Sequence, residues 1–180
     1  KHLREPLKDH QVVLYLRKKQ DFRIDFELPE KWRIKVINFA RFWTQLGLAL
    51  EMLKNPVDVL FIPAHIVPWI HPKRTIVAIH GLEYEFMPEA YSLWRRSYMH
   101  FFIKKSCRWA EKVIAVSKNT REDLRKLYGV PEEKIKVIYE GYDKNYQISH
   151  AYRQAGSSQE KSKIQTMKTS VRDAFSEVRI

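Results

Sequence analysis

The chain has 180 residues, with an apolar fraction of 44% and an aromatic fraction of 13%, which is the composition of a globular protein. The single cysteine, Cys107, excludes an internal disulfide and fits a reducing compartment. No apolar run approaches the roughly 20 residues that a membrane-spanning helix needs, and the opening residues lack the pattern of a signal peptide. The formal net charge of +12 would attract nucleic acid, an anionic membrane or a phosphorylated substrate. No nucleic-acid-binding motif is present, which argues against the first of these.

The first third of the chain predicts two strands followed by a long helix. Residues 11–16 form an apolar strand, and residues 22–28 alternate between apolar and charged side chains, as an edge strand does. After Pro29, apolar residues recur at spacings of four and three up to Asn55-Pro56, which predicts a helix of about six turns. The residues of this stripe are Trp32, Val36, Phe39, Trp43, Leu46, Leu50 and Leu53. We interpret it as a crossover helix packed on a sheet, in preference to a membrane-docking helix.

Four further apolar runs predict strands that are buried on both faces, as in a parallel sheet. They cover residues 57–62, 75–79, 112–117 and 134–139. The connection between the first two runs carries Pro68 and Pro72, has no helical pattern, and is short for a parallel crossover. The element order predicts an α/β chain, Rossmann-like, with a mainly parallel sheet flanked by helices. We expect the strands at Gln11, Val57, Thr75, Lys112 and Lys136 to share this one sheet.

Two helices are predicted between the later strands. The first spans about residues 90–110, with aromatic residues on one side and basic residues opposite. The aromatic set is Trp94, Tyr98, Phe101, Phe102 and Trp109; the basic set is Arg96, His100, Lys104 and Arg108. We interpret the aromatic side as core-facing, with the basic side in solvent or, alternatively, near a phosphate or anionic lipid. The second helix starts at Thr120, with Asp123 in a capping-box-like position, and ends at Gly129.

Polar residues follow each predicted strand. The strands end at His65, His80, Ser117 and Glu140-Gly141, and polar groups gathered at one sheet edge are typical of a small-molecule cleft. His80, directly after the most apolar strand, is a candidate for chemistry, although a strand-end histidine can also simply bond its neighbours. Metal binding by His65, His71 and His80 is a remoter alternative, because their spacing is no metal signature.

Several sequence blocks, taken in order, resemble a known family. They are residues 58–63, 77–82, 110–117 with Thr120 and Asp123-Leu124, 128–131, and 134–143. Together they resemble the N-terminal domain of a family 4 glycosyltransferase, a group of retaining enzymes with the two-domain GT-B fold. The resemblance covers roughly residues 11–143.

The resemblance implies transfer of a sugar from a nucleotide-sugar donor to a glycan or lipid-linked acceptor, with no metal or other cofactor. It implies a mannosyltransferase-like enzyme of polysaccharide or cell-envelope synthesis, cytoplasmic, and touching the inner face of the membrane through basic helices. It also implies that His80 is catalytic and that His80, Gly81, Ser117, Glu140 and Gly141 bind substrate. The family often has His-Asp where this chain has His80-Gly81, and Asn-Gly where it has Glu140-Gly141.

The domain organisation follows from the same resemblance. Residues 1–143 are expected to form the Rossmann-like domain without its first strand. Residues 144–180 are expected to form a linker around 155–159 and a helix around 164–175, leading toward an absent donor-binding domain. Such a fragment would transfer no sugar by itself. The alternative is a non-catalytic α/β module that binds an anionic partner, either a membrane surface or nucleic acid, with steep salt dependence.

Overall fold

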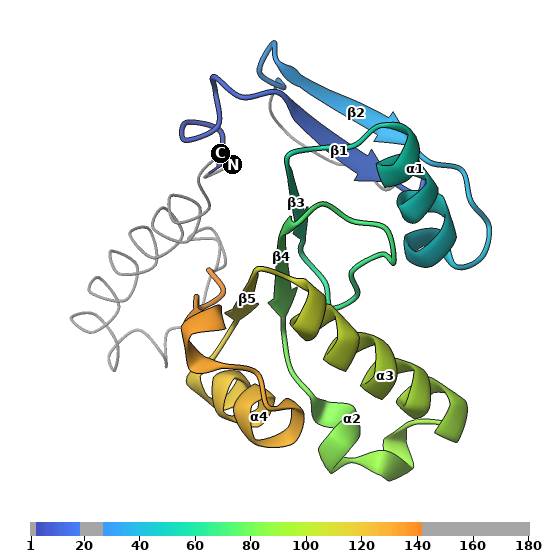
Figure 1. Ribbon diagram of the computed structural model, residues 1–180, viewed down its shortest axis with the longest axis vertical. Coiled ribbons are helices and arrows are strands. Elements are labelled where there is room, and N and C mark those ends of the chain that lie inside the picture. Colours follow the sequence, from blue (N-terminus) through green and yellow to red (C-terminus); the bar gives the residue numbers. More distant parts are fainter. Residues whose placement is uncertain (1–2, 19–26, 142–180) are drawn as a thin grey trace, which may run out of the picture. The chain divides into compact units, whose positions relative to one another are not determined.

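The computed structural model describes residues 3–18 and 27–141, which form parallel sheets flanked by helices (Figure 1). This confirms the predicted α/β class. The chain divides into two compact units. The first comprises Lys1–Val57 with Pro68–Pro72, and the second comprises Asp58–Val67 with Lys73–Ile180. The predicted edge strand at 22–28 lies mostly outside the described residues, and the predicted linker and helix of 144–180 lie wholly outside them.

The first unit contains a two-stranded parallel sheet, which corrects two predictions. Strand β1 (Val12–Leu16) pairs with β2 (Trp32–Val36), and not with the strands of the second unit. Residues 32–36, expected to open a long helix, alternate strictly between apolar and charged side chains. That period of two suits a strand with a partner, and pairing of the backbone with β1 outweighs the four-and-three spacing.

The helix of this unit begins later than predicted and is shorter. A π-helical turn at Trp43–Leu48 runs into α1 (Ala49–Lys54), preceded by Phe42 in the left-handed region with φ 54°. A Cβ at Gly47 would lie 3.0 Å from the Cβ of Phe39, so glycine permits this close approach. The Lys35 ammonium lies 2.7 Å from the carboxylate of Glu51, which ties α1 to β2.

The second unit contains a four-stranded sheet in which every neighbouring pair is parallel. Its order is β3 (Val59–Ile62), β4 (Arg74–Ile79), β5 (Lys112–Ala115) and β6 (Ile135–Val137). Residues Thr75 to Ile79 of β4 are all at most 7% exposed, which confirms a strand covered on both faces. Ile76 and Ala78 pack with Ile114 and Ile138 in one apolar cluster.

Helices follow β4 and β5 and pack on the sheet. The chain leaves β4 through α2 (Glu83–Phe86) and a 3-10 turn at Pro88–Ala90 into α3 (Leu93–Trp109), which packs on β4. Helix α4 (Lys118–Tyr128) follows β5, packs on β5 and β6, and ends at Gly129 in the left-handed region, as predicted. A 3-10 turn at Glu132–Lys134 leads into β6.

The buried face of α3 differs from the prediction. Its buried residues are Ile103, Ser106 and Cys107, whereas Trp94 is 74% and Phe101 52% exposed. Small and branched side chains let a helix lie close to a sheet, and a row of bulky aromatic rings would hold it away. Trp94 and Phe101 are therefore turned toward solvent, whereas Tyr98, Phe102 and Trp109 are half-buried.

The connection from β3 to β4 is irregular, as predicted, and residues 63–67 of it are held by specific hydrogen bonds. The His65 amide donates to the Ala78 carbonyl at 3.1 Å, and the buried Val67 amide donates to the Ser106 hydroxyl at 2.8 Å. That hydroxyl in turn donates to the Phe102 carbonyl at 2.6 Å. These bonds supply the partners that a buried loop needs without a helix.

Candidate functional site at the carboxyl edge of the sheet

The predicted site residues of three strands lie at one edge of the four-stranded sheet. His80 directly follows β4, Ser117 comes two residues after β5, and Glu140 comes three residues after β6. Because these strands are parallel neighbours, their carboxyl ends share one edge, where ligands of open α/β sheets bind. The expectation that His80 and Ser117 share an edge is confirmed, while the roles assigned to them stay predictions.

The His80 ring is held at both of its nitrogens. Nδ1 lies 2.5 Å from Oε1 of Glu140, and Nε2 lies 2.7 Å from the carbonyl oxygen of Pro63. The His80 side chain is 44% exposed, so the ring is accessible at the edge of the sheet. Glu140, predicted to touch substrate, therefore contacts the candidate catalytic side chain directly.

His65 lies against His80 in an unusual backbone conformation. The two ring centroids are 5.2 Å apart in an edge-to-face arrangement, and His65 has φ 50°. Burial, and then the neighbouring His80, lower the pKa of His65, so its neutral form is favoured. Its Nδ1 is buried and has no hydrogen-bond partner among residues 3–18 and 27–141. The sequence marks His65 only as a strand end, and no local signal predicts the left-handed conformation.

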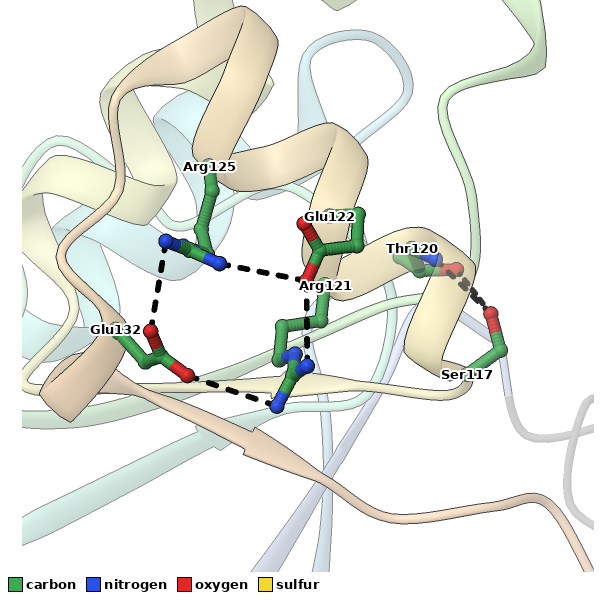
Figure 2. A network of polar contacts seen from close by, with 6 residues as sticks. All are labelled: Ser117, Thr120, Arg121, Glu122, Arg125 and Glu132. Atoms are coloured by element: carbon green, nitrogen blue, oxygen red, sulfur yellow. Dashed lines mark hydrogen bonds and ion pairs between the residues drawn. The ribbon is translucent and has the colours of Figure 1, made fainter.

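Ser117 caps helix α4, and this corrects the predicted helix start. Its hydroxyl accepts a hydrogen bond from the Thr120 amide at 3.0 Å and lies 2.9 Å from the Thr120 hydroxyl (Figure 2). Thr120, predicted as the cap, is instead buried within the first turn, and its hydroxyl lies 3.3 Å from the carbonyl oxygen of His80, to which it donates. Thr120 therefore joins Ser117 to His80, a link that sequence reasoning missed.

The two glycines of the predicted site differ in their surroundings. A Cβ at Gly81 would lie 2.1 Å from Oε1 of Glu83, so a larger residue there would have to displace that side chain. A Cβ at Gly141 would meet no atom within 4 Å. The space around Gly81 is thus already filled by the chain, whereas the space at Gly141 is open in the described structure.

An ion-pair network joins α4 to the 3-10 turn before β6. Arg121 and Arg125 each approach both Glu122 and Glu132, at distances between 3.2 and 3.7 Å (Figure 2). Such partly exposed pairs typically contribute about 0.2–1 kcal/mol each. A shallow hollow of about 400 Å³ lies beside them, and none of the predicted site residues lines it. We therefore assign this network to the stability of the fold.

A buried polar chain anchors α2, the segment just after His80-Gly81. The Tyr84 and Tyr128 hydroxyls are 2.5 Å apart, and the Tyr128 hydroxyl donates to Glu85 at 2.6 Å. His100 Nδ1 also lies 2.6 Å from that carboxylate. Burial favours a raised pKa for Glu85, but the hydrogen bonds from Tyr128 and His100 outweigh it and leave the pKa lowered. Burial raises the pKa of both tyrosines.

The described residues give no geometric support to the metal alternative. Residues 3–18 and 27–141 contain no group of three or more His, Cys, Asp or Glu side chains that could hold a metal ion. The three histidines considered for such a site therefore do not gather into one.

The fold and the carboxyl-edge site define a Rossmann-like α/β domain with a candidate ligand site beyond its parallel strands. The model of Glycosyltransferase Family 4 matches residues 1–146, which is most of the 180-residue chain. The chain therefore belongs to glycosyltransferase family 4, and the assignment to glycosyl transfer in general follows. Comparisons with curated proteins and with solved structures gave no match.

Proposed function

We propose that this chain forms the acceptor-side domain of a retaining GT-B glycosyltransferase, which transfers a sugar from a nucleotide-sugar donor to a glycan or lipid-linked acceptor. The observation that carries the proposal is the family match over a domain whose parallel strands place His80 at their carboxyl edge. A second domain would hold the nucleotide, and no metal is needed. Mannosyl transfer in polysaccharide or cell-envelope synthesis is the pathway that we favour.

The test of this proposal is the replacement of His80 in an enzyme that includes the donor-binding domain. His80→Ala should lower kcat by about 10²-fold and change KM little, because an orienting group acts mainly in the transition state. His10→Ala is a matched control, since His10 is exposed and lies in the other unit. If His80→Ala stays within a few-fold of the parent with the fold intact, His80 has no catalytic role.

The division of labour between domains has its own test. The 180-residue chain, purified alone, should bind no nucleotide sugar and transfer no sugar, because the groups that stabilise the departing nucleotide diphosphate would lie in the second domain. Calorimetry with a panel of nucleotide sugars measures donor binding directly. Donor affinity in the micromolar range, or any turnover, would show that the donor site lies in this chain.

We also propose that helix α3 places this domain on the anionic inner face of a membrane from the cytoplasmic side. The 17 residues of α3 include five basic residues and no acidic one. Leu93 and Trp94 at its start are 82% and 74% exposed, and Phe101 is 52% exposed. Exposed aromatic side chains beside lysine and arginine suit the interface of an anionic bilayer. Within residues 3–18 and 27–141, no helix is long and apolar enough to cross the bilayer itself.

Vesicle binding tests the membrane contact and separates it from the non-catalytic alternative. The chain should bind vesicles containing phosphatidylglycerol, and Trp94→Ala with Phe101→Ala should weaken binding about tenfold or more by removing buried aromatic area. Leu53→Ala is a control, because Leu53 is 62% exposed in the other unit. Equal loss with the control would refute the role of α3. If the chain binds anionic vesicles but no sugar acceptor has a saturable effect on the enzyme, the non-catalytic anion-binding module is favoured.

A further inference from the structure

Both nitrogens of the His80 ring face atoms that act as hydrogen-bond acceptors. The Pro63 carbonyl oxygen, 2.7 Å from Nε2, can only accept. The Glu140 carboxylate, 2.5 Å from Nδ1, is likewise an acceptor. A neutral imidazole carries one N–H and can donate to only one of the two. A ring that satisfies both contacts at once is therefore doubly protonated.

We propose that Glu140 is a positioning residue that holds His80 as an imidazolium with a fixed ring plane. In this state His80 has no lone pair with which to accept a proton, so it acts through its charge and its N–H groups and not as a general base. Such a cation at the sheet edge suits the negative charge that develops on a departing diphosphate group. This catalytic consequence rests on the proposed function, whereas the state of the ring does not.

The surroundings of His80 support a ring of fixed charge and orientation. The neighbouring His65 ring is 5.2 Å away, and its pKa is lowered by burial and by His80, which fits one charged and one neutral imidazole in contact. The turn from Pro63 to His65 is itself constrained, with His65 at φ 50° and its amide bonded to Ala78. Left-handed non-glycine residues are costly and cluster at functional sites. This constrained residue lies two positions after Pro63, whose carbonyl oxygen faces Nε2.

The ring state can be measured in the 180-residue chain without any substrate. Nitrogen NMR of the imidazoles at one neutral pH should show both His80 nitrogens in the N–H form. Glu140→Gln, which removes the charge and keeps the size, should leave one ring nitrogen without its proton. Glu133→Gln removes the same charge before β6 and should leave the His80 signals unchanged, and the amide spectrum checks that each variant is folded. Identical His80 signals in the parent and in Glu140→Gln would overturn the proposal, as would an equal change in Glu133→Gln.

Kinetics of the two-domain enzyme then test the consequence. Glu140→Gln should lower kcat by about tenfold with little change in KM, the loss expected for one charged hydrogen bond. Glu140→Asp should recover part of that loss, because it restores the carboxylate. Equal loss in both variants would overturn the positioning role. A normal NMR response with no effect of His80→Ala on turnover would instead refute the proposed function of His80 and leave the imidazolium assignment standing.

Discussion

Replacing Ser117 by alanine separates two roles for a residue predicted to bind substrate. In the structure its hydroxyl caps α4, accepting from the Thr120 amide at 3.0 Å and lying 2.9 Å from the Thr120 hydroxyl. Loss of a serine cap typically costs about 1 kcal/mol, within a range of about 0.5–2. Loss of a second, neutral hydrogen bond adds about 0.5–1.5 kcal/mol at most, because the Thr120 hydroxyl keeps its contact with the His80 carbonyl.

Taken together, these losses should lower the free energy of unfolding of Ser117→Ala by about 1.5–2.5 kcal/mol, which is roughly a tenfold to seventyfold change in the folding equilibrium. Ser117→Asn should retain most of the stability, because asparagine caps as well as serine. Ser92→Ala is the matched control: Ser92 caps α3, but its contact with the Arg95 amide is 3.4 Å and exposed. Its loss should cost about 0.5 kcal/mol, at the low end of the range for caps.

The assay is urea unfolding of the 180-residue chain, followed by circular dichroism. The order of stability should be parent, then Ser117→Asn and Ser92→Ala, then Ser117→Ala. The cap geometry does not determine the stability if Ser117→Ala and Ser92→Ala lower the free energy of unfolding equally. The same conclusion follows if Ser117→Asn lowers it as much as Ser117→Ala does. If Ser117→Ala instead leaves stability unchanged and raises the KM of the enzyme, the residue binds substrate as the family resemblance implies.

Two further predictions concern buried titratable groups. Tyr128→Phe should cost about 1–3 kcal/mol, because it removes the hydroxyl partner of Tyr84 and leaves Glu85 with His100 alone, and urea unfolding measures the loss. Since the pKa of Glu85 is lowered on folding, its ionised form stabilises the fold at pH values above the usual glutamate pKa, and that contribution is lost as the pH falls below this value and through the lowered pKa. The penalty of Tyr128→Phe should therefore shrink in acid, and a penalty independent of pH would contradict the network. Burial raises the pKa of Cys107 to about 12, so a thiol reagent at pH 7 should react with it only on unfolding; rapid reaction of the native chain would show that α3 opens readily.

The sequence was a good guide where a residue's neighbours along the chain determine its environment. The run from Thr75 to Ile79 is apolar on both faces, and it forms the buried strand that delivers His80 to the sheet edge. It was a poor guide where two patterns compete, as in residues 32–36, which fit both a helix stripe and an alternating strand until β1 supplies a partner. The contact of Glu140 with His80 joins residues 60 positions apart, and such pairs depend on the fold of the whole sheet.

The orientation of α3 shows a second limit. Aromatic residues at helical spacing favour a core-facing interpretation, yet here the small side chains of Ser106 and Cys107 face inward. Burying the largest apolar surface would turn the aromatic side of α3 toward the sheet, whereas close packing favours the side with the small residues. In this fold close packing determines which side is buried. Hydrophobicity along the sequence carries no information on that fit.

The hydroxyl of Ser106 makes helix α3 a mechanical support for the site. This hydroxyl accepts a hydrogen bond from the amide of Val67, which lies four residues after Pro63, whose carbonyl oxygen contacts the His80 ring. A displacement of α3 along its axis must therefore either break this fully buried hydrogen bond or draw the turn at Pro63 and His65 with it. The Ser106 side chain thus connects α3, which carries the exposed Trp94 and Phe101, to the loop that holds the imidazole of His80. A surface that binds α3 and shifts it would therefore also change the orientation of the His80 ring.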